Sequence, residues 1–138
     1  MIRYILDTDH LSLAQRRHPQ GIARILSTPK DEIAITIITV EEQIRGRFAE
    51  IRRHQSGKDC VIAYQQLRQT LDNLLGVSIL DFDPAAELID QMLKSQKLKI
   101  GTQDRRIAAI ALANNCQVIT RNISDFGQIP GLQMENWA

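Results

Sequence analysis

Short apolar, β-branched segments alternate with longer segments of helical periodicity along the whole chain. The clearest short segments are Tyr4 to Leu6 and Ile33 to Ile38, in which nearly every residue is apolar or β-branched. Strands without a polar face are typical of a parallel sheet that helices cover on both sides. Val77 to Phe82 and Val118 to Thr120 are predicted as two further strands, and Leu132 to Trp137 as an edge strand. The predicted fold class is therefore α/β with a mostly parallel sheet.

The segments between these strands carry the end signals of helices. Two short helices separated by a turn are predicted between Leu11 and Leu26. Thr39 is the predicted N-cap of a helix that runs to about His54, and Asp59 is predicted to open a second helix. In that second helix, apolar residues from Val61 to Leu75 fall on one stripe. The two helices are expected to form an antiparallel hairpin.

Composition limits the class of protein. The chain has 138 residues, 43% of them hydrophobic, which suits a single core and one domain over residues 1–138. A net charge of +1 argues against a protein held to nucleic acid by bulk electrostatics alone. Aromatic residues make up 4% of the chain, too few for a base-stacking platform.

The two cysteines, Cys60 and Cys116, show neither a CxxC motif nor a histidine at zinc-ligand spacing. We interpret both as buried thiols in a reducing compartment. No apolar run approaches the ~20 residues of a membrane span, and the first residues do not resemble a signal peptide. We therefore expect a cytoplasmic protein without a membrane segment.

Acidic and amide residues follow the predicted strands. Asp7 follows the first strand, and Glu42 lies in the first turn after the second. Asp104 begins the helix that leads into the fourth strand, which Asn122 and Asp125 follow. Residues just past the carboxyl ends of parallel strands converge in space. Crowded carboxylates commonly bind a divalent cation, and an all-oxygen set favours Mg²⁺ or Mn²⁺ over zinc.

Each of these residues also has a purely structural interpretation. Glu42 stands three residues after Thr39 and matches a capping box, which spacing alone favours. Asp104 suits the first turn of a helix, and Asp125 suits a turn. Asp7 has no evident structural purpose at the end of an apolar strand. His10 is three residues further on, where it could line the pocket, although capping or packing explains it as well.

Four segments carry a family likeness. The segments LDTDHLS at Leu6 to Ser12, ITVEEQIRG at Ile38 to Gly46, GTQDRRIAA at Gly101 to Ala109 and TRNISDF at Thr120 to Phe126 occur in order and at suitable spacings. Together they resemble the motifs of PIN-domain ribonucleases, in particular the VapC-type toxins of bacterial toxin-antitoxin pairs. The likeness spans nearly the whole chain.

The resemblance implies a three-layer α/β/α fold with a protruding helical hairpin. It implies a Mg²⁺-dependent endoribonuclease, with Mn²⁺ as the other candidate ion, that cleaves RNA. It also implies a homodimer and a VapB-type antitoxin whose tail lies over the active site. Carried over by position, Asp7, Glu42 and Asp104 are the metal ligands, and Asn122 or Asp125 supplies a fourth catalytic position. The residues assigned to substrate positioning are Thr8, Thr120 and Arg105.

Two other classes remain open from the sequence. Receiver domains also place an acidic Mg²⁺ pocket at the strand ends of a doubly wound sheet, but this chain lacks an acidic pair after the first strand. A PIN-like fold that binds without cutting is the other alternative, because Asn122 occupies a position where the family has either an acid or an amide.

Overall fold

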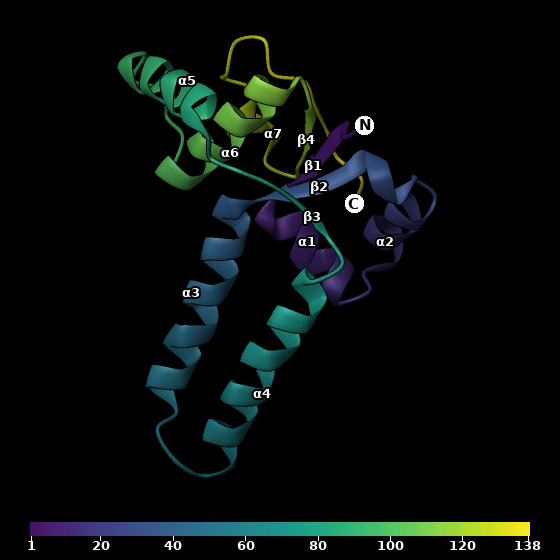
Figure 1. Cartoon of the computed structure of the whole chain (residues 1–138), viewed down its shortest axis with the longest axis vertical. Coiled ribbons are helices and arrows are strands. Elements are labelled where there is room, and N and C mark those ends of the chain that lie inside the picture. The colour runs from purple at the N-terminus through teal and green to yellow at the C-terminus, as the bar shows by residue number, and fades with distance from the viewer.

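The computed structural model describes residues 1–138, and its strands form one five-stranded sheet (Figure 1). The strand order is β3-β2-β1-β4-β5, and every neighbouring pair is parallel. The strands are β1 Tyr4–Leu6, β2 Ile33–Thr36, β3 Ser78–Leu80, β4 Gln117–Ile119 and β5 Met134–Glu135. The prediction of an α/β fold with a parallel sheet is confirmed. The order differs from the 2-1-3-4-5 arrangement of receiver domains, which removes that alternative.

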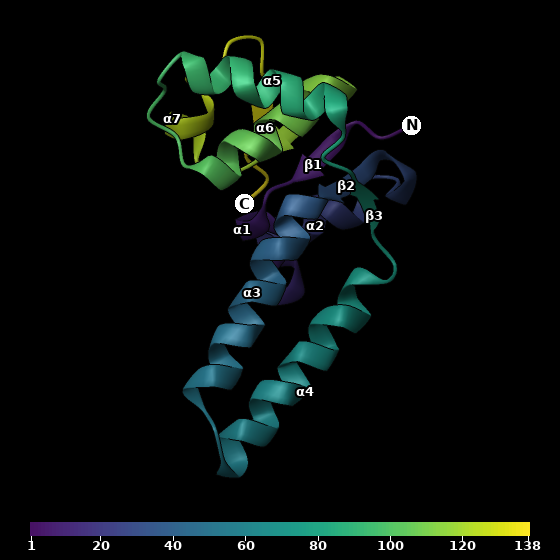
Figure 2. The same cartoon turned by 60° about the vertical axis from the view of Figure 1, so that its left-hand side comes forward.

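Seven α-helices and one 3₁₀ turn connect the strands. They are α1 Thr8–Gln15, α2 Pro19–Leu26, the turn Lys30–Glu32, α3 Ile37–Arg53, α4 Gly57–Leu74, α5 Pro84–Ser95, α6 Thr102–Asn114 and α7 Ile123–Phe126. Figures 1 and 2 show α3 and α4 running antiparallel and extending away from the sheet as the predicted hairpin. No helix combines the length and the apolar character needed to cross a bilayer.

The sheet separates two apolar clusters, as the three-layer architecture requires. Alternate residues of a strand point to opposite faces. Accordingly, Ile5 and Val118 pack in a cluster with α5, α6 and α7, whereas Leu6 and Ile119 pack in a second cluster with α1 and Trp137. Because both faces are covered, the central strands β1 and β2 are buried except for the partly exposed Tyr4, and Thr36 at the end of β2 is their one residue without an apolar or aromatic side chain.

The second strand ends earlier than predicted. β2 stops at Thr36, whose hydroxyl oxygen accepts the Thr39 amide at 3.3 Å, so that Thr36 is the N-cap of α3. The prediction of Thr39 as the cap is therefore wrong. Ile37 and Ile38 prolong the β-branched pattern of the strand, but Ile38 enters the core from the first turn of a helix. Glu42 consequently lies in the second turn of α3, outside a capping box.

The apolar stripe predicted on α4 is mostly exposed. Leu74 is buried, whereas Val61, Tyr64, Leu71 and Leu75 all face solvent. Of the two cysteines, Cys116 is buried as expected and Cys60 is only partly buried, and both are free thiols.

Candidate metal centre

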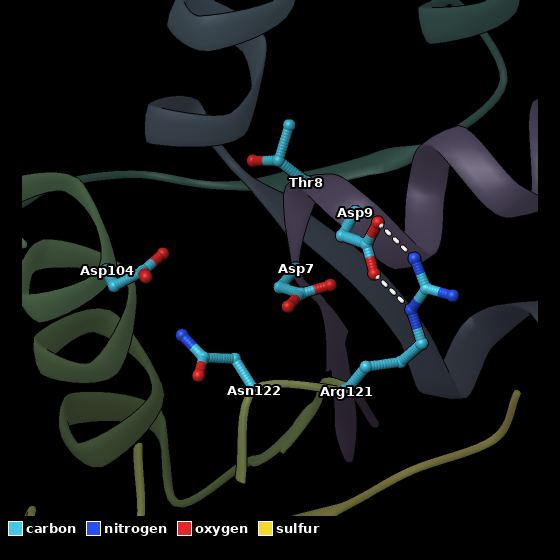
Figure 3. A pocket seen from close by; sticks show the side chains of 6 residues that line it. All are labelled: Asp7, Thr8, Asp9, Asp104, Arg121 and Asn122. Carbon is cyan, nitrogen blue, oxygen red and sulfur yellow. Dashed lines mark hydrogen bonds and ion pairs between the residues drawn. The ribbon is translucent and has the colours of Figure 1, made fainter. Parts of the chain in front are cut away.

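A polar pocket lies at the carboxyl end of the sheet, between β1, β4 and the start of α6 (Figure 3). Its volume is about 480 Å³, and no hydrophobic residue lines it. The lining residues come from three separate parts of the chain and are Asp7, Thr8, Asp9, Asp104, Arg121 and Asn122. The convergence of Asp7, Asp104 and Asn122, which was expected from their positions next to the strand ends, is present in the structure.

Asp7 has a structural role that the sequence did not indicate. It is the N-cap of α1, because its Oδ1 accepts the backbone N–H of His10 at 2.8 Å. The side chain is 8% exposed. The other oxygen, Oδ2, accepts no hydrogen bond within the protein. One oxygen of Asp7 thus fixes the helix start, and the second is free to face the pocket.

Asp104 stands in an environment that opposes its negative charge. Partial burial, followed by the negative charges of Glu42, Asp7 and Asp125, raises the pKa of Asp104 to about 6, while a hydrogen bond from Asn122 acts in the opposite direction. The other four predicted site residues are thus close enough to Asp104 to act on its carboxyl group. A divalent cation among them would relieve the repulsion.

Glu42 is not one of the residues that line the pocket, but it is bonded to one of them. Thr8 donates a hydrogen bond from its hydroxyl to Glu42 Oε1 at 2.6 Å, and the same hydroxyl is 3.1 Å from that of Thr39. The bond joins the first turn of α1 to the second turn of α3. Thr8 therefore orients the Glu42 carboxylate, which supports the expectation that this hydroxyl organises the acidic site.

The turn after β4 carries Asn122, the residue predicted at the fourth position of the site. The fully buried Thr120 accepts the backbone N–H of Asn122 through its hydroxyl oxygen at 2.8 Å. The Asn122 side chain donates from Nδ2 to Asp125 Oδ2 at 2.9 Å. Asn122 thus lines the pocket, and Asp125 supports it from the first turn of α7.

Arg105, expected to position substrate, is engaged elsewhere. Its Nε donates to Asp90 Oδ1 at 2.7 Å, and the two side chains are 13% and 2% exposed. This ion pair joins α6 to α5, away from the pocket lining. The arginine that lines the pocket is Arg121, which the sequence reasoning did not select.

Arg121 forms a two-pronged ion pair with Asp9. Its Nε is 2.7 Å from Asp9 Oδ2, and its Nη2 is 2.9 Å from Asp9 Oδ1 (Figure 3). The hydrogen bonds from Arg121 lower the pKa of Asp9. A sequence signal for both residues was present, since Asp9 lies two residues after Asp7 and Arg121 directly precedes Asn122.

The side chains of Asp7, Asp9 and His10 bring ligand atoms within 4.8 Å of one another. Asp9, however, is neutralised by Arg121, and His10 Nε2 accepts a backbone amide. Of the predicted site acids, Asp7, Glu42, Asp104 and Asp125 all lack a lysine or arginine partner, and Asp125 accepts a hydrogen bond from the neutral Asn122 side chain. An oxygen donor set that is incomplete by itself fits Mg²⁺, which keeps several waters in protein sites.

Comparisons with known proteins agree with this geometry. Residues 4–132 match the model of the PIN domain. The curated protein "Ribonuclease VapC1" of Haemophilus influenzae (strain R2866) is 29% identical over 136 residues, which cover 97% of each protein.

Solved structures also match over nearly the full length. The crystal structure of VapBC2 from Rickettsia felis bound to a promoter DNA fragment is similar, with a TM-score of 0.73 and 28% identity over 100% of both chains. VapBC-1 from nontypeable Haemophilus influenzae gives a TM-score of 0.76 and 29% identity, covering 99% of this chain and 98% of that one.

Proposed function

The chain belongs to the PIN-domain family, and on that premise we propose that it is a metal-dependent endoribonuclease, the toxin of a VapBC-type pair. The observation that carries the proposal is the group of carboxylates at the carboxyl end of the sheet, in which partial burial and then the charges of the other acids raise the pKa of Asp104. The VapC1 relative is named a ribonuclease, and the Rickettsia felis and Haemophilus influenzae structures are VapBC complexes. We include the whole of residues 1–138 in one PIN domain.

The proposed metal ligands are Asp7, Glu42 and Asp104, and the proposed ion is Mg²⁺, with Mn²⁺ as the alternative. When bound, the ion supplies positive charge that activates a water and stabilises the leaving oxygen of an RNA phosphodiester. Thr8 holds Glu42 in place, and Asn122 with Asp125 completes the polar rim. These residues orient the ion and the substrate phosphate without any nucleophile supplied by the protein.

Arg121 is the proposed contact for the RNA backbone. Asp9 occupies Nε and Nη2, so that Nη1 and one hydrogen of Nη2 are left to bind a phosphate oxygen. Because the guanidinium is already oriented, less rotamer entropy is lost when it binds RNA. This residue takes the substrate-positioning role expected of Arg105, whose Nε is committed to Asp90.

The proposed partners are a VapB-type antitoxin and a second copy of the chain. The exposed apolar side chains of α4, from Val61 to Leu75, offer a surface for one of these partners. A substrate RNA and an antitoxin partner would place the protein in the cytoplasm.

Cleavage of RNA by the purified protein tests the proposal. Protein freed of antitoxin is expected to cut structured RNA in Mg²⁺ and to lose activity in EDTA. Asp7→Asn and Asp104→Asn are each expected to reduce cleavage at least 100-fold, since each removes a ligand charge. Asp31→Asn is the matched control. Asp31 is exposed in the turn before β2, so it lies at the amino end of that strand, whereas the pocket lies at the carboxyl end of the sheet.

Two outcomes would count against the proposal. Activity that persists in both site variants would come from a contaminating nuclease. Tight RNA binding without cleavage in either Mg²⁺ or Mn²⁺ would favour the non-catalytic PIN-like protein instead.

A further inference from the structure

We infer that His10 is a positioning residue for the metal-site carboxylate of Asp7, held in the required tautomer by the backbone of Trp137. The inference rests on the proposed function in that it assigns Asp7 to the metal. It concerns a histidine that does not line the pocket and a chain end that is remote from Asp7 in sequence.

The first observation is the hydrogen bond at Nε2. His10 is completely buried, and its Nε2 accepts the backbone N–H of Trp137 at 3.3 Å. A backbone amide can only donate, so Nε2 carries no proton. In a neutral imidazole the proton then resides on Nδ1.

The second observation is the position of Nδ1. This atom is buried and has no well-formed hydrogen bond, and Asp7 Oδ1 lies 3.4 Å away. The same Oδ1 accepts the His10 backbone N–H at 2.8 Å. The backbone N–H of His10 is therefore bonded to Asp7 Oδ1, and the buried ring Nδ1 lies near the same oxygen without forming a hydrogen bond to it. Rotation of the carboxylate would break the backbone bond and move Oδ1 away from the ring.

The consequence concerns the second oxygen of Asp7. With Oδ1 committed to His10, Oδ2 is the oxygen presented to the pocket. Hydrogen bonds to a ligating carboxylate orient it and tune its affinity for the ion. His10 thus contributes to metal binding without touching the metal.

Several contacts hold Trp137 in place, so that its backbone N–H stays directed at Nε2 of His10. The Trp137 ring meets Tyr4 edge to face with ring centroids 5.0 Å apart, and the guanidinium of Arg24 lies 5.0 Å from its centroid. Arg24 also pairs with Glu135 at 3.3 Å. These contacts fix the peptide N–H of Trp137 opposite His10.

Two amide substitutions distinguish the contributions of the two ring nitrogens of His10. In His10→Asn the side-chain amide can place a donor where Nδ1 stood, whereas in His10→Gln an acceptor can occupy the place of Nε2 and nothing replaces Nδ1. We expect His10→Asn to bind Mg²⁺ within about threefold of wild type and His10→Gln to bind at least tenfold more weakly. Calorimetric titration with Mg²⁺, on variants whose thermal melting shows a folded protein, measures both.

Equal losses in the two variants, or a greater loss in His10→Asn, would show that His10 only fills space and would overturn the inference. The order of the two affinities is the deciding result, because both variants remove the same ring from the same cavity.

The tautomer is tested on the wild-type protein, so no variant has to fold. Nitrogen-15 NMR of labelled histidine in metal-free protein is expected to show His10 with a protonated Nδ1 and an unprotonated Nε2. Trp137→Phe keeps the peptide N–H and is expected to leave this pattern unchanged. A proton on Nε2 in the wild type would overturn the inference. Neither measurement uses RNA, so an inactive protein that binds Mg²⁺ as described would contradict the proposed nuclease and leave the role of His10 standing.

Discussion

Asp104 is the residue at which the electrostatics of the site can be measured most directly. Partial burial of its carboxyl group, and then the charges of three other acids, raise the pKa of Asp104 to about 6. In the unfolded chain the same group has a pKa of about 3.9. Between about pH 4 and pH 6, the folded, metal-free protein therefore holds a proton on Asp104 that the unfolded chain has already lost.

This difference predicts how stability depends on pH. A raised pKa in the folded state stabilises the fold at low pH, and that stabilisation is lost as pH rises from about 4 through 6. At about pH 7.5, Asp104→Asn is expected to raise the metal-free free energy of unfolding by about 1 kcal/mol, a value reduced for solvent screening at this half-exposed site. Urea unfolding in EDTA measures it.

The gain from Asp104→Asn should vanish near pH 4, where the wild-type carboxyl is itself neutral. A gain that is the same at both pH values would show that charge repulsion is not its cause.

Arg121 gives a second prediction at the scale of one residue. Arg121→Ala is expected to raise the KM for RNA roughly tenfold with little change in kcat, because it removes a contact to a phosphate that does not react. Arg52→Ala, in the exposed last turn of α3, is the control. A fall in kcat at unchanged KM would instead place Arg121 at the reacting phosphate.

Sequence reasoning reached the acidic site residues but missed their partners, for a physical reason. Position after a strand predicts that Asp7, Asp104 and Asn122 converge, since parallel strands share one carboxyl edge. It does not predict which side chain pairs with which. Arg105 and Arg121 are both near the site in sequence, yet helix α6 turns Arg105 toward Asp90, while the turn after β4 directs Arg121 toward Asp9.

At the scale of elements, the Arg105–Asp90 pair joins α6 to α5. Asp90 is 2% exposed, so removing its partner leaves a buried charge uncompensated. Arg105→Met is expected to lower the free energy of unfolding by about 3 kcal/mol, and the double variant with Asp90→Leu is expected to recover most of that loss. Urea unfolding checks both values.

The same variants decide between two roles of Arg105. If its role is structural, the double variant should cleave RNA at the wild-type rate per folded molecule. A stable double variant with a raised KM for RNA would show that Arg105 contacts the substrate, as its position in the sequence suggested.

Most elements could be predicted from the sequence, and the exceptions lie where two elements join. The short apolar runs gave the five strands, and the parallel pairing follows from the helical segments between them. The junction of β2 and α3 was misplaced, because Ile37 and Ile38 suit a strand as well as a buried first turn of helix. Ile38 is buried in the core from the first turn of α3, and such burial depends on the packing of the folded molecule, which the local sequence does not specify.

The exposed stripe of α4 shows the same limit in another form. Spacing correctly placed Val61, Tyr64 and Leu71 on one face of a helix, but a single chain does not reveal what covers that face. In the structure α4 packs on α3 through a different side, on which Ala63 and Thr70 are buried.

For the whole molecule, a net charge of +1 describes the chain without its ion. One or two bound Mg²⁺ would raise it to about +3 or +5, and the added charge would lie in the pocket beside Arg121. The protein therefore does not need an overall basic surface to attract RNA. Its attraction is local and depends on the ion.

The order in which the sheet is completed has a consequence for the cell that makes this protein. β1 is synthesised well before β4, its parallel neighbour in the sheet, and before Asn122, which follows β4. A nascent chain cannot assemble the pocket until β4 and Asn122 have left the ribosome. A fragment that ends before β4 would therefore lack one side of the pocket.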